Sequence, residues 1–173
     1  MKKVSLFLVA MLTMSLSIFA QKFCYVDSDY ILNQMPEYKT AQSKLDDIAA
    51  QWQNEIQDRY QGIDDMYKAY QADQVLLTEE QRKKREDAII SKEKELKDYQ
   101  KQKFGYEGEL FKKRQELIKP IQDKIYAEIQ KLAKQRAYDF IFDKSSGTVM
   151  LFANEEFDQS SIILKSLGVK VKE

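Results

Sequence analysis

The chain has 173 residues, with 28 Lys or Arg, 28 Asp or Glu, one Cys and no His. A formal net charge of zero gives no overall attraction to nucleic acid, and the missing His and scarce Cys remove the usual ligands of zinc and most transition metals. Five Gly and two Pro leave few places for turns, so we expect long elements, no cofactor and no nucleic-acid partner.

Residues 1–20 predict a cleaved export signal. Two lysines follow the first Met, residues 4–19 form an apolar run broken only by Ser and Thr, and Ala20 is a small residue suited to cleavage. An uncleaved membrane anchor is the alternative, but the run is shorter than the ~20 residues that usually span a bilayer. Cleavage leaves 26 basic against 28 acidic residues.

Cys24 lies close behind this signal, but Phe23 rather than a small residue precedes it, which argues against lipidation. We expect Cys24 to be a buried strand residue, with a disulfide between chains as the alternative. The stretch around it, "KFCYVD", residues 22–27, is rich in β-favouring residues and predicts a strand. "SDYILNQMPE" then predicts a helical turn or loop, and Pro36 suits the first turn of the next helix.

Residues 37–72 predict one long helix, because apolar side chains recur every three or four positions. The turn near 73–78 ends with Thr78 and Gln81, which have the spacing of a capping box, and a second helix is expected over 79–134. Two long helices joined by a short turn should pack antiparallel. Pro120, inside the second helix, predicts either a hinge or a static kink.

The C-terminal part predicts two strands, residues 138–143 and 148–153, as a hairpin around "KSSG". A short helix over 161–167, capped by Asp158 or Ser160, should follow, and "GVKVK" is a possible last strand. Strands that are apolar on both faces need cover on both, which one short helix cannot supply, so we expect the strands to oligomerise. The residues expected in this oligomerisation body are Phe23, Tyr25, Val26, Phe140, Ile141, Phe142, Val149, Leu151 and Phe152.

The predicted fold class is therefore mostly α with a small β body. Its domains are residues 21–36 with 117–173 as the body and residues 37–116 as a helical hairpin. The sequence has no Gly-rich phosphate loop, nucleophile elbow, His base or metal-ligand cluster, so we expect no enzyme activity and no use of ATP.

The order of four stretches resembles the Skp/OmpH family of periplasmic chaperones. They are "KFCYVDSDYILNQMPEYKTAQSKL", "LLTEEQRKKREDAIISKEKELKDYQKQ", "PIQDKIYAEIQKLAKQRAYDFIFD" and "VMLFANEEFDQSSIILKSL", and they span nearly all of the mature chain. The resemblance implies a periplasmic homotrimer of jellyfish shape, in which an intersubunit β-barrel carries projecting helical hairpins as tentacles. It also implies an ATP-independent holdase that keeps unfolded outer-membrane proteins from aggregating before membrane insertion.

Such a protein needs scattered apolar contacts rather than a deep pocket. The candidates for contact with an unfolded client are Tyr60, Met66, Tyr67, Tyr70, Val75, Leu76, Leu77, Tyr99, Phe104, Tyr106 and Phe111. For the tip residues 75–77 the alternative is that they only close the turn, and for the others it is packing between the two helices of one hairpin.

Two alternative functions stay open. One is a structural coiled-coil spacer or adaptor of the envelope with a folded partner. The other is binding of lipopolysaccharide or weak contact with a membrane, although this chain lacks the strong positive charge of the best-known family members. The candidate anionic-lipid patch is Arg82, Lys83, Lys84 and Arg85.

Overall fold

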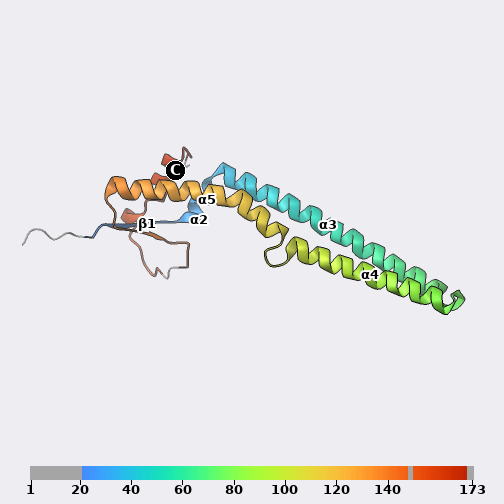
Figure 1. Cartoon of the computed structure of the whole chain (residues 1–173). Helices are drawn as coiled ribbons and strands as arrows, with labels where there is room; N and C mark the ends of the chain where they lie inside the picture. The colour runs from blue at the N-terminus through green and yellow to red at the C-terminus, as the bar shows by residue number, and fades with distance from the viewer. Residues whose placement is uncertain (1–20, 148–149, 171–173) are drawn as a thin grey trace, which may run out of the picture. The chain divides into compact units, whose positions relative to one another are not determined.

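The computed structural model describes residues 21–147 and 150–170, which are mostly helical with one two-stranded sheet (Figure 1). They form two compact units, which we name the helical arm, residues 32–124, and the sheet unit, residues 21–31 with 125–170. In chain order the elements are β1 (Phe23–Val26), α2 (Ser28–Gln34), α3 (Pro36–Asp73), the 3-10 turn η1 (Gln74–Leu76), α4 (Glu79–Phe104), α5 (Glu109–Arg136), β2 (Phe140–Asp143), the 3-10 turn η2 (Glu155–Phe157) and α6 (Ser160–Ser166).

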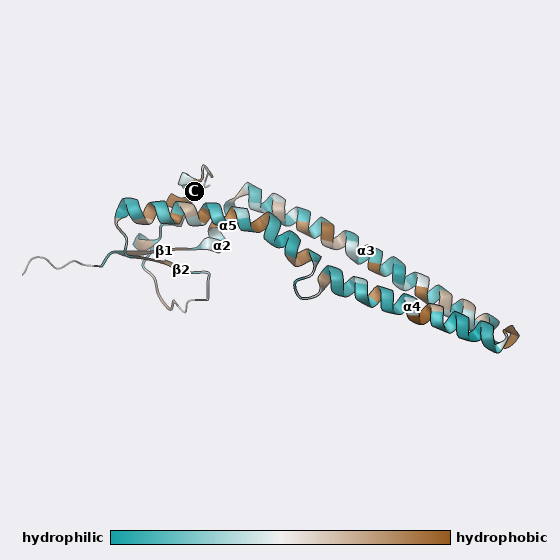
Figure 2. Ribbon diagram, in the orientation of Figure 1, coloured by the Kyte–Doolittle hydropathy of each residue, from teal (hydrophilic) through white to brown (hydrophobic). Residues whose placement is uncertain are grey.

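Within the helical arm, α3 and α4 pack side by side as the predicted antiparallel hairpin (Figure 1). Hydrophobic positions lie among mostly hydrophilic ones on both helices in Figure 2, and the buried ones pack together between the helices. Each fully buried aliphatic side chain in such a seam contributes about 1.5–3 kcal/mol. The buried residues of this seam are Ile56, Ile63, Tyr70, Ile89 and Leu96.

The ends of these helices follow local sequence signals. Pro36 occupies the first turn of α3, where its missing N–H leaves no helical hydrogen bond unmade. Thr78 caps α4, because its hydroxyl accepts a hydrogen bond from the backbone N–H of Gln81 at 3.3 Å. The Gln81 side chain accepts in return from the N–H of Thr78 at 3.0 Å, so the predicted capping box is confirmed.

The prediction of one continuous helix over 79–134 is wrong, because α4 ends at Phe104 and α5 begins at Glu109. Gly105 is responsible for part of this break: a Cβ there would collide with the carbonyl oxygen of Lys101. Glu107 adds a positive φ of 54°, which no helix contains. By contrast, Pro120 lies inside α5 without ending it, so a hinge at Pro120 stays a prediction.

The sheet unit is built on β1 and β2, which pair in parallel with Phe23 opposite Phe140 and Val26 opposite Asp143. Parallel strands need a long crossover connection, and here the whole helical arm lies between them in sequence.

The predicted C-terminal β-hairpin is therefore wrong. β2 pairs with β1, and residues 150–153 form no strand, whereas residues 148–149 lie outside the described residues. Residues 168–170 of the possible last strand are also not in a strand, and residues 171–173 are outside the described part of the chain.

The core of the sheet unit comes from β1, α2, α5 and α6. Cys24, Val26 and Ile31 are almost completely buried, as are Ile163 and Leu164 of α6. The last helix begins at Ser160, one residue before the predicted start. The carboxylate of Asp158 accepts a hydrogen bond from the backbone N–H of Ser160 at 2.8 Å. Of the two predicted caps, Asp158 and Ser160, it is therefore Asp158 that supplies the capping hydrogen bond.

A half-buried carboxylate also fixes β2 to the start of α2. Asp143 accepts hydrogen bonds from the Ser28 hydroxyl at 2.6 Å, from the Ser28 N–H at 3.1 Å and from the Ser145 hydroxyl at 2.9 Å. Burial of Asp143 raises its pKa, but these donors outweigh burial and hold the pKa below its usual value.

Candidate functional site

The tip of the helical arm exposes apolar side chains. Val75 and Leu76 lie in η1 and are 90% and 82% exposed, and hydrophobic colour gathers at this turn in Figure 2. Leu77 is half-buried and packs against the seam between α3 and α4. The predicted triplet at residues 75–77 therefore divides: its first two side chains face solvent, and its third closes the turn.

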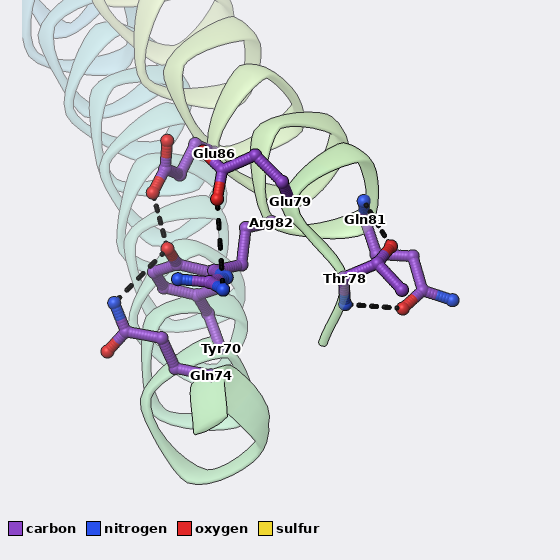
Figure 3. A network of polar contacts seen from close by, with 7 residues as sticks. All are labelled: Tyr70, Gln74, Thr78, Glu79, Gln81, Arg82 and Glu86. Carbon is purple, nitrogen blue, oxygen red and sulfur yellow. Dashed lines mark hydrogen bonds and ion pairs between the residues drawn. The ribbon is translucent and has the colours of Figure 1, made fainter. Parts of the chain in front are cut away.

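A network of polar contacts stabilises this tip (Figure 3). The phenol of Tyr70 on α3 donates a hydrogen bond to the carboxylate of Glu86 on α4, which raises the pKa of Tyr70. The amide of Gln74 donates to the Tyr70 oxygen at 3.4 Å, and Arg82 pairs with Glu79 at 3.7 Å. The exposed side chains of η1 are thus held on an ordered turn.

The candidate anionic-lipid patch is weaker than its sequence indicates. The guanidinium of Arg85 pairs with Asp73 at 2.8 Å, and that of Arg82 pairs with Glu79. Lys83 and Lys84 are exposed. Two of the four positive charges are therefore balanced by carboxylates at the tip itself.

The candidate client contacts along the arm differ in burial. Tyr70 is buried in the seam, as the alternative of packing between the helices requires. Met66 and Tyr99 are half-buried against the same seam, and Tyr106 is 97% exposed. The candidates that are exposed but partly covered are Tyr60, Tyr67, Phe104 and Phe111.

A groove of about 520 Å³ on the arm brings two of these candidates together. Tyr60 and Tyr67 of α3 line it with Ile63, and Leu96 of α4 forms part of the opposite wall. The Tyr67 hydroxyl donates to the carboxylate of Glu93 at 3.0 Å, so the rim is polar. The remaining residues that line the groove are Asp64, Glu93, Lys97 and Gln100.

The sheet unit carries a second exposed apolar surface. Phe23, Phe140 and Phe142 share one face of the sheet through the register of β1 and β2, and about half of each side chain faces solvent. The rings of Phe140 and Phe142 stack with centroids 6.3 Å apart. Leu151 and Phe152, 94% and 85% exposed, follow in the chain.

The other predicted body residues lie in the core or outside the described part. Tyr25 and Val26 are buried, Ile141 is half-buried, and Val149 is outside the described residues. Phe157 was missed by the sequence analysis, although its ring stacks on Phe23 with centroids 5.3 Å apart. Its only signal was an isolated aromatic residue in the acidic stretch "NEEFDQ".

A cavity of about 430 Å³ opens beside this surface. It is predominantly apolar and contains side chains from β1, β2 and the segment before α6. Its lining residues are Phe23, Cys24, Tyr25, Phe142, Met150, Phe152, Ala153, Asn154 and Phe157. Cys24 is one of the lining residues and is buried, and this burial, followed by the nearby Asp158 carboxylate, raises the pKa of the thiol to about 11.

Among residues 21–147 and 150–170, no cluster of three or more Cys, Asp or Glu side chains could hold a metal ion. In the same residues, no helix has the length and apolar character needed to cross a membrane.

The molecule defined by these features is a helical-hairpin protein with a small parallel sheet and exposed apolar surfaces. The model of the family "Outer membrane protein (OmpH-like)" matches residues 22–167, so the chain belongs to the OmpH-like family. A candidate outer membrane chaperone (OmpH-like) from Caulobacter crescentus has a similar fold in its crystal structure, with a TM-score of 0.71 and 14% sequence identity. The match covers 88% of this chain and 87% of that chain. None of the curated proteins compared with the sequence matches it.

Proposed function

We propose that this protein is an ATP-independent periplasmic holdase that binds unfolded outer-membrane proteins and prevents their aggregation before insertion. The observation that carries the proposal is the exposure of apolar side chains at the tip and along the arm, where Tyr60 and Tyr67 also line an open groove. Scattered contacts of this kind suit many weak, sequence-tolerant interactions, which add up when they surround one client. Membership of the OmpH-like family and the fold of the Caulobacter chaperone support it.

The proposal includes a homotrimer held together by the sheet unit. Phe23, Phe140 and Phe142 form an apolar face that the described part of the chain leaves half exposed, and no described strand pairs with the outer edge of β2. Copies of the same strands are the economical cover, because they would satisfy the edge and bury the Phe face together. Three sheets assembled in this way would form the intersubunit β-barrel, with one helical arm projecting from each chain.

The proposed export by a cleaved signal over residues 1–20 places the working protein in the periplasm, where no ATP is available and where outer-membrane proteins pass unfolded. Holding of a client then depends on binding energy alone. The sequence offers no nucleotide site, and the proposed activity is not catalytic.

The test is suppression of aggregation. The mature chain, at one trimer per client, should keep a urea-denatured outer-membrane β-barrel protein from scattering light after dilution, without ATP. A variant with Val75→Ser, Leu76→Ser and Tyr106→Ser should remain a trimer but protect the client less well, because it loses the three most exposed apolar side chains of the arm. Undiminished aggregation at saturating wild-type trimer would refute the holdase proposal.

The same experiment separates the alternatives. A structural spacer would leave the aggregation of the β-barrel unchanged and bind a folded envelope protein instead. A lipopolysaccharide binder would show binding that falls steeply with salt. The ion pairs of Arg82 and Arg85 leave Lys83 and Lys84 as the main charges for such an interaction, which favours the unfolded-protein proposal.

A further inference from the structure

The break between α4 and α5 lies inside the helical arm and is a short turn (Figure 1). The N–H of Gly108 donates to the carbonyl of Gly105 at 2.9 Å, and the N–H of Lys112 donates to the carbonyl of Gly108 at 3.1 Å. A Cβ at Gly108 would lie 2.9 Å from two backbone oxygens, so this turn admits only glycine without rearrangement. Glu107, at a φ of 54°, is in the left-handed region that disfavours residues with a Cβ.

One carboxylate bridges this break. Glu109 is the first residue of α5, and its two oxygens accept hydrogen bonds from the amide of Gln102, at 2.8 Å, and from the ammonium of Lys103. Both donors lie in the last turn of α4. The Lys103 hydrogen bond is the main reason that the pKa of Glu109 is lowered.

Lys103 in turn rests on α3. Its ammonium lies 4.6 Å from the centre of the Trp52 ring on α3 and 5.2 Å from the centre of the Tyr99 ring on α4. The Lys103 side chain is only 14% exposed. Phe104 meets the same Trp52 ring edge-on, with centroids 6.1 Å apart. The ammonium therefore joins a carboxylate of α5 to an aromatic ring of α3, a position where cation–π attraction gains from partial desolvation.

The geometry points to a hinge at residues 105–108 and to a clasp, formed by Glu109, Lys103 and Trp52, that holds one bend between α4 and α5. The loop backbone is the flexible part, because two glycines occupy its ends and only a few hydrogen bonds cross it. The clasp is the part that fixes the angle, because it is the polar connection that ties the first turn of α5 to both α4 and α3. Opening the clasp frees α5 to move relative to α4 while each helix stays intact, as in hinge motions of other proteins.

This inference concerns the conformations of the arm and does not require the holdase function. It is tested by double electron–electron resonance in the mature chain, with Cys24→Ser and spin labels at Lys84→Cys on α4 and Gln115→Cys on α5. The labelled chain is mixed with an excess of unlabelled chain, so that distances within one chain dominate. The parent should give one narrow distance distribution, and Glu109→Ala should give a broad one.

Glu116→Ala is the matched control, because Glu116 also lies on α5 and pairs only one turn away, with Lys113. It should leave the distribution narrow. Lys103→Met is the second variant: it keeps a flexible side chain over Trp52 but removes the charge, so it should broaden the distribution as Glu109→Ala does. It also tests the clasp if Glu109→Ala lowers the helix content measured by circular dichroism.

Hydrogen exchange supplies an independent readout. Loss of the clasp should speed exchange at the amides of Gly108 and Lys112 by about tenfold or more, since the charged hydrogen bonds to Glu109 no longer resist opening. Amides in the middle of α4 should exchange at the parent rate. The inference is overturned if Glu109→Ala and Lys103→Met both keep a narrow distance distribution and parental exchange rates, or if the parent is already as broad as the variants.

Discussion

Phe140→Asp should prevent assembly of the proposed trimer. Phe140 is 53% exposed in the single chain. An aromatic side chain buries roughly 150–250 Å² when fully covered, so assembly would cover about 100 Å² more of each Phe140. At about 25 cal/mol per Å², this is about 2.5 kcal/mol per chain, or roughly 7 kcal/mol for three chains. A loss of that size corresponds to about a 10⁵-fold weaker association, before the cost of burying three carboxylates is added.

Sedimentation velocity at micromolar concentration measures the outcome. Wild-type mature chain should sediment as a trimer and Phe140→Asp as a monomer with the helix content of the arm preserved. Ile90→Asp is the control, because Ile90 is 59% exposed but lies on α4, which belongs to the helical arm and not to the sheet unit. A Phe140→Asp protein that still sediments as a trimer would refute the argument from the Phe face.

The remaining predictions concern stability and reactivity. Leu96→Ala should lower the free energy of unfolding by about 2–4 kcal/mol in a urea titration, because Leu96 is buried in the seam, whereas Ile90→Ala should change it by less than about 0.5 kcal/mol. Cys24 should react with a thiol reagent at pH 8 only after unfolding, since it is buried and its pKa is raised to about 11; rapid labelling of the native protein would contradict this. The lowered pKa of folded Asp143 means that its ionised form stabilises the fold above the unfolded value of about 3.9, and this contribution is lost as pH falls through the folded value. The difference between the melting temperatures of wild type and Asp143→Asn should therefore stay constant from pH 6 down to about pH 4 and shrink below that, and a difference that persists down to pH 2 would rule out the contribution.

The helical arm could be predicted from local sequence because its signals are local. The spacing of apolar residues by three and four positions determines which face of α3 is buried, and Ile56 and Ile63 lie in the seam as expected. Thr78 and Gln81 form their capping box within one turn of helix. Tyr60 and Tyr67 share the same spacing but remain exposed, because a two-helix hairpin covers only a narrow stripe.

The sheet could not be predicted in the same way, because strand pairing depends on distant segments. Residues 140–143 were correctly expected to form a strand, but nothing near them shows that β1, more than a hundred residues earlier, takes the pairing position. A short loop such as "KSSG" favours an antiparallel hairpin, because it brings the two segments beside it close together. In the structure β2 instead pairs in parallel with β1. Phe157 was missed for the same reason: its contact with Phe23 spans almost the whole chain.

The break between α4 and α5 was not predicted, because the apolar pattern of the side chains does not change where the backbone leaves the helix. The apolar spacing continues past Phe104, so periodicity alone predicts a continuous helix, and one glycine in a helix costs only about 1 kcal/mol. Gly105 and Gly108 allow a turn at this point. The helical hydrogen bonds lost there are partly offset by the bonds that Gln102 and Lys103 donate to the Glu109 carboxylate. The turn also leaves Tyr106 almost fully exposed, as η1 leaves Val75. Both connections are too short to turn these side chains into the seam, so the most exposed apolar groups of the arm lie where the stability of the hairpin does not depend on them.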